Sequence, residues 1–164
     1  MTLLSIDPGL TAVGCCLLVD GIPTNAFTLH HVTPETVWEM MLRQCPGVLG
    51  EGLPDEVLVE KPDSWTRSGK NVQAILQVSA VAHVLWAYFE SFRYQGKAIH
   101  AYLRSVREIR GTRTKAVTDF ETTHVYPGIA KNAHERDALY NGLWWYQRRK
   151  VEIAVHSRSL ERGT

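Results

Sequence analysis

The sequence predicts an α/β domain built on a five-stranded mixed sheet with helices on its faces. Two observations predict it: the chain opens with three β-prone segments joined by hairpin-type turns, and later strands alternate with helical segments. The segments that read as strands are residues 2–7, 12–19, 25–32, 56–60 and 97–103. Because hairpins pair strands antiparallel and helical crossovers pair them parallel, we expect both kinds of pairing in one sheet.

Turn residues bound these strands. Pro8-Gly9 turns the chain at the end of the first strand, and Asp20-Gly21 is a hairpin signal before the third. The fourth strand, with the sequence EVLVE, stops at Lys61-Pro62 because a proline favours an end to regular structure before it.

Helix signals fill the intervals between strands. Thr33 as N-cap and Pro34 at the first helical position predict a helix that ends near residue 46. Residues 71–92 form a long helix with apolar residues on nearly every face, which places it in the centre of the fold, at an interface, or both. Thr112 or Thr114 caps a further helix of about a dozen residues.

The last helix is predicted over residues 132–149. Asn132 can cap it, and Glu135, three residues on, completes a capping-box pattern. A single domain is therefore expected over residues 1–150, followed by a polar, frayed C-terminal tail at 151–164.

Composition indicates an ordinary globular protein. Of 164 residues, 45% are hydrophobic and 21% are charged. Asp7 interrupts the first apolar run too early for a signal peptide, and polar residues such as Gln77 and Glu90 interrupt the most apolar helix, so no membrane association is expected. Three cysteines fit neither a disulfide framework nor a zinc site, which favours reduced thiols and a cytoplasmic location.

The net charge of +1 hides a local excess of basic residues. Seven basic residues face one acid, Glu108, between positions 93 and 115: Arg93, Lys97, Arg104, Arg107, Arg110, Arg113 and Lys115. A second basic cluster covers residues 148–150. Such stripes are compatible with a phosphate-bearing partner, and equally with a solvated charged surface.

Three acidic residues stand apart from the surface charge. Asp7 ends the first strand, Glu60 ends the fourth, and Asp137 lies in the first turns of the last helix, with His134 on the same helical face. Carboxylates brought together away from water need protonation or a cation, and Mg²⁺ prefers oxygen ligands. A pair of such ions can activate a water and stabilise the leaving oxygen of a phosphodiester. Taken singly, Asp7 fits an Asx turn equally well, and Glu60 an ordinary strand-end charge.

With these motifs in hand, the sequence resembles the RuvC family of Holliday-junction resolvases, which are ribonuclease-H-like nucleases. The segment SIDPGLTAVG is similar to the strand-turn-strand motif of the family, VLVEKP to its second acidic strand, and NAHERDAL to its final motif. The resemblance implies that Asp7, Glu60, His134 and Asp137 form the catalytic site and bind two Mg²⁺ or Mn²⁺ ions. It also implies that Lys115 supports the scissile phosphate.

The same resemblance implies a homodimer, with residues 71–92 in the interface, that acts on four-way or branched DNA in a bacterial cell or a phage-infected host. The residues expected to contact DNA are Trp65, Arg67, Lys70, Arg104, Arg107, Arg110, Arg113 and Lys115. The loop after Glu60 departs from the family pattern: Trp65 is out of the usual register and can either stack on an unpaired base or pack on the protein. Val13 replaces a common threonine, which suggests a divergent, phage-type branch.

Three alternatives remain open at this point. One is a related ribonuclease-H-like nuclease that acts on branched DNA in general or on RNA–DNA hybrids. Another is a junction-binding module without catalytic activity, although the complete set of acids argues against it. The third is an ATPase of the actin–hexokinase type, because DPGLTAVG also satisfies the D-x-G-x-T-x-x-G phosphate loop of that class, although 164 residues leave no room for its second domain.

Overall fold

The computed structural model describes residues 1–44, 53–63, 72–94 and 96–161. Its main sheet has five strands in the order β3-β2-β1-β4-β7. These strands are β1 (Thr2–Pro8), β2 (Ala12–Val19), β3 (Ile22–His30), β4 (Glu56–Lys61) and β7 (His100–Ser105). β1 pairs antiparallel with β2 and parallel with β4, and β4 pairs parallel with β7, so the predicted mixed sheet is confirmed.

Two strand boundaries differ from the prediction. β3 begins at Ile22 because Asp20 and Gly21 both have positive φ and form a tight two-residue turn that returns the chain at once. The segment predicted as one strand over 97–103 is divided: β6 (Lys97–Ala98) pairs with β5 (Arg93–Tyr94) in a separate ribbon, and only β7 joins the main sheet.

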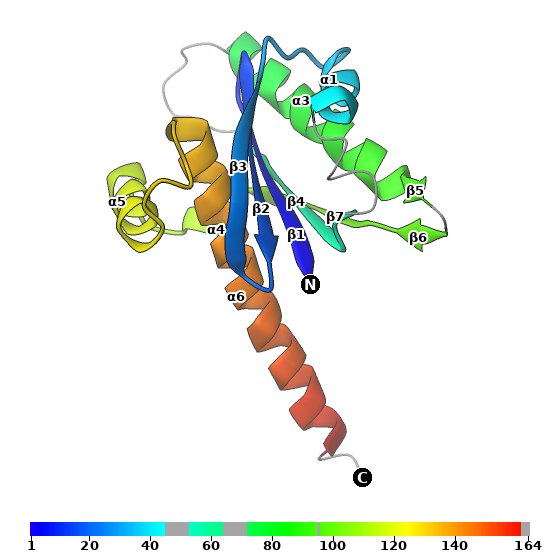
Figure 1. The fold of residues 1–164 in the computed structure, drawn as a ribbon, viewed down its shortest axis with the longest axis vertical. Helices are drawn as coiled ribbons and strands as arrows, with labels where there is room; N and C mark the ends of the chain where they lie inside the picture. The colour runs from blue at the N-terminus through cyan, green and yellow to red at the C-terminus, as the bar shows by residue number, and fades with distance from the viewer. Residues whose placement is uncertain (45–52, 64–71, 95, 162–164) are drawn as a thin grey trace.

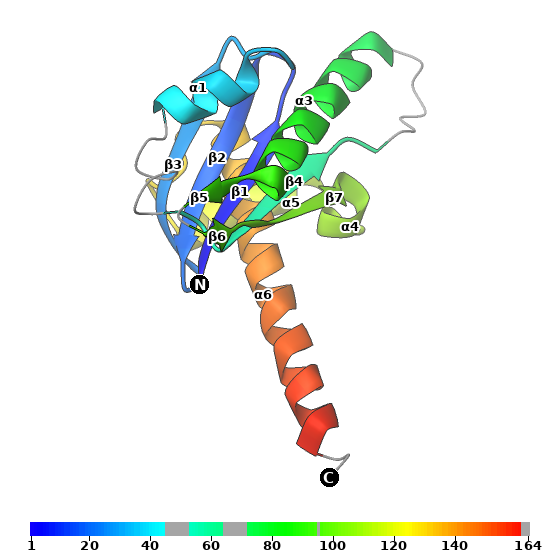
Figure 2. The same ribbon diagram turned by 90° about the vertical axis from the view of Figure 1, so that its right-hand side faces the viewer.

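Helices cover both faces of the sheet (Figures 1 and 2). One face carries α1 (Val37–Gln44) and α3 (Val72–Ser91). The other carries α4 (Val106–Arg110), α5 (Lys115–Val125) and α6 (Ala133–Glu161). α1 starts later than predicted, although the Thr33 hydroxyl does accept a hydrogen bond from the Thr36 amide at 3.3 Å. Thr114 occupies the N-cap position of α5 without a side-chain hydrogen bond there.

The prediction that the last helix ends near Arg149 is wrong. α6 continues to Glu161, and its C-terminal half projects past the sheet (Figure 1). The sequence from 151 to 161 contains no glycine or proline, and Glu152 pairs with both Arg148 and Arg149 one turn before it. The polar tail is therefore helical for most of its length rather than frayed.

Two apolar layers hold the sheet between the helices. Leu4 and Ile6 of β1 pack toward α1 and α3, in a layer that includes Leu85 and Phe89. Leu3 faces the opposite way, into a layer closed by α6. Since side chains alternate along a strand, Ser5 and Asp7 follow Leu3 onto the α6 side.

Within the described part of the chain, α3 is long and apolar enough to cross a membrane by length and composition alone, with a mean hydropathy of 1.4. Its residues Val81, Ala82, Leu85 and Phe89 are nevertheless buried against the sheet. A core helix of a globular protein meets the same criterion, so the finding is weak evidence for a membrane span.

Candidate active site

The carboxyl ends of two central strands bring Asp7 and Glu60 together. β1 and β4 are parallel neighbours with Ile6 opposite Val59, and each acid follows its paired residue by one position. Both side chains are buried, with Asp7 7% and Glu60 6% exposed. The rigid sheet therefore fixes two carboxylates side by side in a place with little water.

The N-terminus of α6 brings His134 and Asp137 to the same edge. The Asn132 side chain accepts a hydrogen bond from the Glu135 amide at 3.0 Å, which confirms the predicted N-cap. The Glu135 carboxylate accepts bonds from the Lys131 amide and the Thr28 hydroxyl instead of facing the site. The predicted capping box therefore forms only in part, because Glu135 accepts from the amide of Lys131, one residue before the N-cap, and not from that of Asn132. Its bond with Thr28 ties the start of α6 to β3.

Gly14 of β2 allows this close approach. A Cβ at Gly14 would overlap the carbonyl group of His134, so only glycine lets the first turn of α6 lie directly on β2. Gly9 has a similar effect on the His134 ring, because its Cβ would lie 2.5 Å from His134 Cε1.

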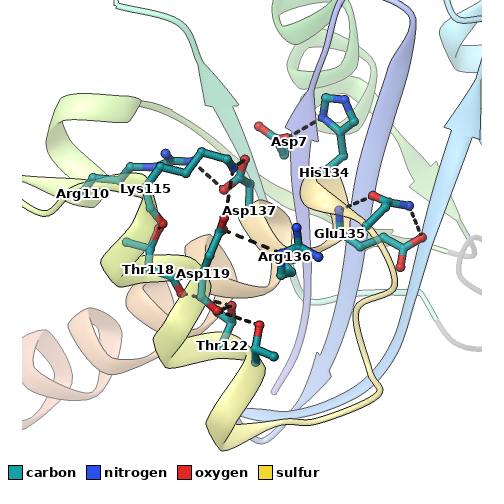
Figure 3. Close-up of polar contacts among 12 residues, drawn as sticks. Asp7, Arg110, Lys115, Thr118, Asp119, Thr122, His134, Glu135, Arg136 and Asp137 are labelled. Carbon is teal, nitrogen blue, oxygen red and sulfur yellow. Dashed lines mark hydrogen bonds and ion pairs between the residues drawn. The ribbon is translucent and has the colours of Figure 1, made fainter.

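Asp7 and His134 form the first pair of the site. Nδ1 of His134 lies 3.0 Å from Oδ2 of Asp7 (Figure 3). Burial raises the pKa of Asp7 and repulsion from Asp137 adds to the rise, while the hydrogen bond with His134 opposes it. The same hydrogen bond raises the pKa of His134.

Glu60 is held by Asn141, one turn further along α6 than Asp137. The Asn141 amide donates to Oε2 of Glu60 at 2.6 Å, and both side chains are buried. Burial, followed by repulsion from Asp7, raises the pKa of Glu60 to about 8. A nearby cation would lower this pKa again, because its positive charge favours the ionised form of the carboxyl group.

Asp137 is held by two basic residues from the other side. Oδ1 of Asp137 lies 2.8 Å from Arg110 of α4, and Oδ2 accepts from the Lys115 amine of α5 (Figure 3). Lys115 also lies 3.7 Å from Asp119. The third carboxylate is therefore neutralised by protein cations.

This arrangement fits a divalent cation in chemistry but is not assembled as a ligand set. Among the residues that the structure describes, no three His, Cys, Asp or Glu side chains are placed to hold a metal together. Burial, with repulsion among the three acids, nevertheless raises the pKa of Asp7 and of Glu60. Oδ1 of Asp137 is buried with the Arg110 guanidinium, at 2.8 Å, as its ion-pair partner but with no well-aligned hydrogen bond. Oxygen donors in excess of their hydrogen bonds are what a hard cation such as Mg²⁺ prefers.

The residues predicted to contact DNA lie in different environments. Trp65, Arg67 and Lys70 fall outside the described residues. The Arg104 guanidinium lies over the Trp145 ring, 5.4 Å from its centroid, on the α6 side of the sheet. Arg107 is exposed on α4, and Arg113 is exposed beside α5, where it pairs with Glu121 at 3.1 Å.

Sequence reasoning missed Asn141 and the direct contact between Arg110 and Asp137. Asn141 lies four residues after Asp137, so it occupies the same helical face, and this spacing is the signal that could have found it. The position of Arg110 depends on the short helix α4, which the sequence did not predict.

Comparisons with known proteins bear on the fold that carries this site. No family model matches the chain, and no curated protein sequence matches it. Two solved structures are similar: Thermus thermophilus RuvC in complex with Holliday junction substrate, with a TM-score of 0.59, and a structure of Thermus thermophilus RuvC, with a TM-score of 0.58. Each is 21% identical in sequence, and the match covers 92% of this chain and 96% of that chain. The likeness shows the fold, and the predicted ribonuclease-H-like sheet is confirmed.

Proposed function

We propose that this protein is a divalent-metal-dependent endonuclease that resolves four-way DNA junctions by paired, symmetric nicks. One observation carries the proposal: three buried acids, Asp7, Glu60 and Asp137, meet beside two basic residues at one edge of a sheet with the fold of Thermus thermophilus RuvC. That relative was solved with a Holliday junction substrate. The nuclease domain would cover residues 1–150.

Each site residue has a role in this proposal. Asp7, Glu60 and Asp137 would hold two Mg²⁺ or Mn²⁺ ions, with His134 as a further ligand or as a group that takes a proton from water. The ions would supply an activated water and charge stabilisation at the leaving oxygen. The Asn141 side chain, which projects from α6, keeps Glu60 in place by a hydrogen bond to its carboxylate.

In this proposal, Lys115 and Arg110 contact the phosphates of the DNA backbone. Both now pair with Asp137, and a cation bound to Asp137 would compete with them for its oxygens. Released from Asp137, their charges would be free to contact a phosphate, which favours DNA and metal binding together. The exposed Arg107 and Arg113 would extend the salt-dependent attraction.

Paired nicks require two sites, which a homodimer with two-fold symmetry supplies. α3 is the candidate interface. Its first turns expose Val72 and Leu76, 64% and 63% accessible, beside a groove of about 530 Å³ that Pro34 and Ala80 also line. A second copy of α3 would cover these apolar side chains.

The test is a comparison of DNA substrates. Purified protein is incubated with end-labelled four-way junctions, flaps, Y-forks, linear duplexes and RNA–DNA hybrids, with and without Mg²⁺ or Mn²⁺, and the cuts are mapped. We expect metal-dependent nicks at matching positions in two opposite strands of the four-way junction, at a rate at least about tenfold above that for duplex, a discrimination of about 1.4 kcal/mol.

Equal cleavage of forks, flaps and junctions would instead support the related nuclease of broader range. Preferential cleavage of the hybrid would support the ribonuclease alternative. Cleavage that is the same without metal would contradict the proposed chemistry in all of these forms.

A further inference from the structure

A cleft lies between α5 and α6, next to the candidate active site but separate from its acids. Its volume is about 420 Å³, within the range of roughly 300–1,000 Å³ that small-molecule sites occupy. The residues that line it are Arg113, Glu121, Thr122, Val125, Tyr126, Tyr140, Leu143, Trp144 and Gln147. We refer to it as the α5–α6 cleft.

The walls of the α5–α6 cleft suit a flat aromatic ligand. Three aromatic side chains line it, from the end of α5 and from successive turns of α6. Trp144 is only partly buried, unlike the adjacent Trp145, which is 1% exposed. Part of Trp144 is exposed, and the Arg148 guanidinium lies over its ring, 5.4 Å from the centroid. A base would stack on the part of the ring that Arg148 leaves uncovered.

The rim carries hydrogen-bonding groups that can read a base edge. Arg113 donates to the Tyr140 hydroxyl at 3.2 Å and to Glu121 at 3.1 Å, so a donor and an acceptor face each other at the opening. Gln147 adds an amide with both functions. Arginine and carboxylate side chains are the groups that distinguish base edges in DNA complexes.

The cleft starts within one helical turn of the proposed cutting site. Asp137, Tyr140 and Trp144 lie three and four residues apart along α6, so they share one stripe of the helix. Arg113 precedes Lys115, the residue that bonds Asp137, by two positions. A nucleotide next to a phosphate bound at Asp137 would therefore have its base at the mouth of the cleft.

We infer that the α5–α6 cleft takes one unstacked nucleobase of the cut strand and gives the enzyme its base preference there. The inference rests on the proposed function. The cost of moving a base into a pocket is lowest where its pairing or stacking is already disturbed. Stacking on aromatic side chains then holds the base, and the Arg113–Glu121 pair discriminates between bases.

Val125 offers a way to fill the cleft without touching the core. Its side chain lines the cleft and the residue is 64% exposed, so Val125→Trp should occupy the cleft without destabilising the fold. Val117→Trp is the matched control, because Val117 lies on the same helix, is 45% exposed and does not line the cleft.

The first measurement does not depend on cleavage. Junctions that carry 5-iodouracil at each position near the cut are bound without divalent metal and irradiated, and crosslinked peptides are identified by mass spectrometry. We expect crosslinks to Trp144 or Tyr126 from one nucleotide position, and their loss in Val125→Trp but not in Val117→Trp. The second measurement compares cleavage rates with each base or an abasic site at that position. A preference of at least about fivefold in the wild-type protein should fall below about twofold in Val125→Trp.

The outcomes separate the two proposals. Junction binding and cleavage with no crosslink to residues of the cleft, or with the same base preference in Val125→Trp, would overturn the inference and leave the proposed function intact. Crosslinks to the cleft without metal-dependent cleavage would support base binding and contradict the nuclease. A chain that binds no DNA would overturn both.

Discussion

At the scale of single residues, Glu60 shows how burial in the fold opposes the ionisation of a carboxyl group at the site. Its carboxyl group is buried between Asp7 and Asn141, and one amide donor cannot compensate for burial and for a neighbouring acid. Glu60 therefore retains a proton up to a pH of about 8 in the absence of a cation. Asn141 does for Glu60 what His134 does for Asp7: it fixes the orientation of an acid that would otherwise be repelled.

This imbalance predicts that the metal-free protein loses stability as pH rises. The pKa of Glu60 goes from 4.5 to about 8 on folding, so the folded state binds the proton more tightly and its advantage is lost as pH rises across that range. The raised pKa values of Asp7 and His134 act in the same direction. Each pKa unit is worth about 1.4 kcal/mol. We expect the Tm in EDTA to fall by about 5 °C between pH 6 and pH 8.5.

Glu60→Gln removes the titrating group at nearly constant size, and Glu39→Gln, at an exposed position of α1, is its control. Thermal melts should show a smaller pH-dependent fall for Glu60→Gln alone, and a smaller rise in Tm when Mg²⁺ or Mn²⁺ is added at pH 8.5. Identical pH profiles for the wild-type protein and Glu60→Gln would contradict this account of the site.

The three acids of the site could be predicted from the sequence. Asp7 and Glu60 each end a recognisable strand, and Asp137 lies in the first turns of a capped helix. Their partners could not be predicted. The Asn141–Glu60 and Arg110–Asp137 contacts join segments far apart in the chain, and their geometry depends on how α6 and α4 lie on the sheet. The capping of α6 by Asn132, in contrast, is a local interaction and was predicted.

At the scale of elements, the contact between β2 and α6 positions the two site residues of that helix, His134 and Asp137. Gly14 lies against the backbone of His134, and backbone atoms cannot move aside as a side chain can. Gly142 lies about two turns after His134 on α6, and a Cβ added there would meet mainly the flexible side chain of Leu18.

We therefore expect Gly14→Ala to be the more harmful of two one-carbon changes. It should push the start of α6 from the sheet, destabilise the protein by about 2 kcal/mol as an overpacking change, and weaken metal binding. Gly142→Ala should cost less and leave metal binding close to the wild-type value. Urea unfolding and calorimetric metal titration measure the two effects, and a smaller effect of Gly14→Ala than of Gly142→Ala would refute the explanation.

The hairpin turn at Asp20-Gly21 and the Asn132 cap of α6 follow from local patterns and were predicted, as were the bounds of β1, β2 and β4 to within about one residue. The misjudged elements depend on context. The split of β6 from β7 follows from pairing with β5, a ribbon too short to show a pattern. In α6 past residue 150, the apolar side chains that the structure describes, Val151, Ile153 and Val155, are exposed, so no buried stripe marks the helix there.

At the scale of the whole molecule, α3 lies on the face of the sheet opposite to α6 (Figure 2). Its exposed apolar side chains include Val72, Leu76 and Tyr88. If this surface joins two copies, Leu76→Glu should place a charge in the interface and give a monomer in light scattering. The paired nicks should then lose their coupling, so that single-nicked junctions accumulate. Exposed Ile22→Glu, on β3 at 64% accessibility, is the control and should leave the oligomeric state unchanged. A Leu76→Glu protein that keeps the mass of the wild-type protein would contradict α3 as the interface.

In the proposed mechanism, carboxylates from two strands and one helix cut DNA junctions with the help of metal. The decisive measurement is cleavage and binding of one labelled four-way junction by the wild-type protein and Asp7→Asn, in the presence of Mg²⁺ or Mn²⁺. We expect paired nicks by the wild-type protein, a loss of at least about 10³-fold in rate for Asp7→Asn, and binding of the junction by Asp7→Asn within about threefold of the wild-type affinity. Cleavage by Asp7→Asn at the wild-type rate would contradict it.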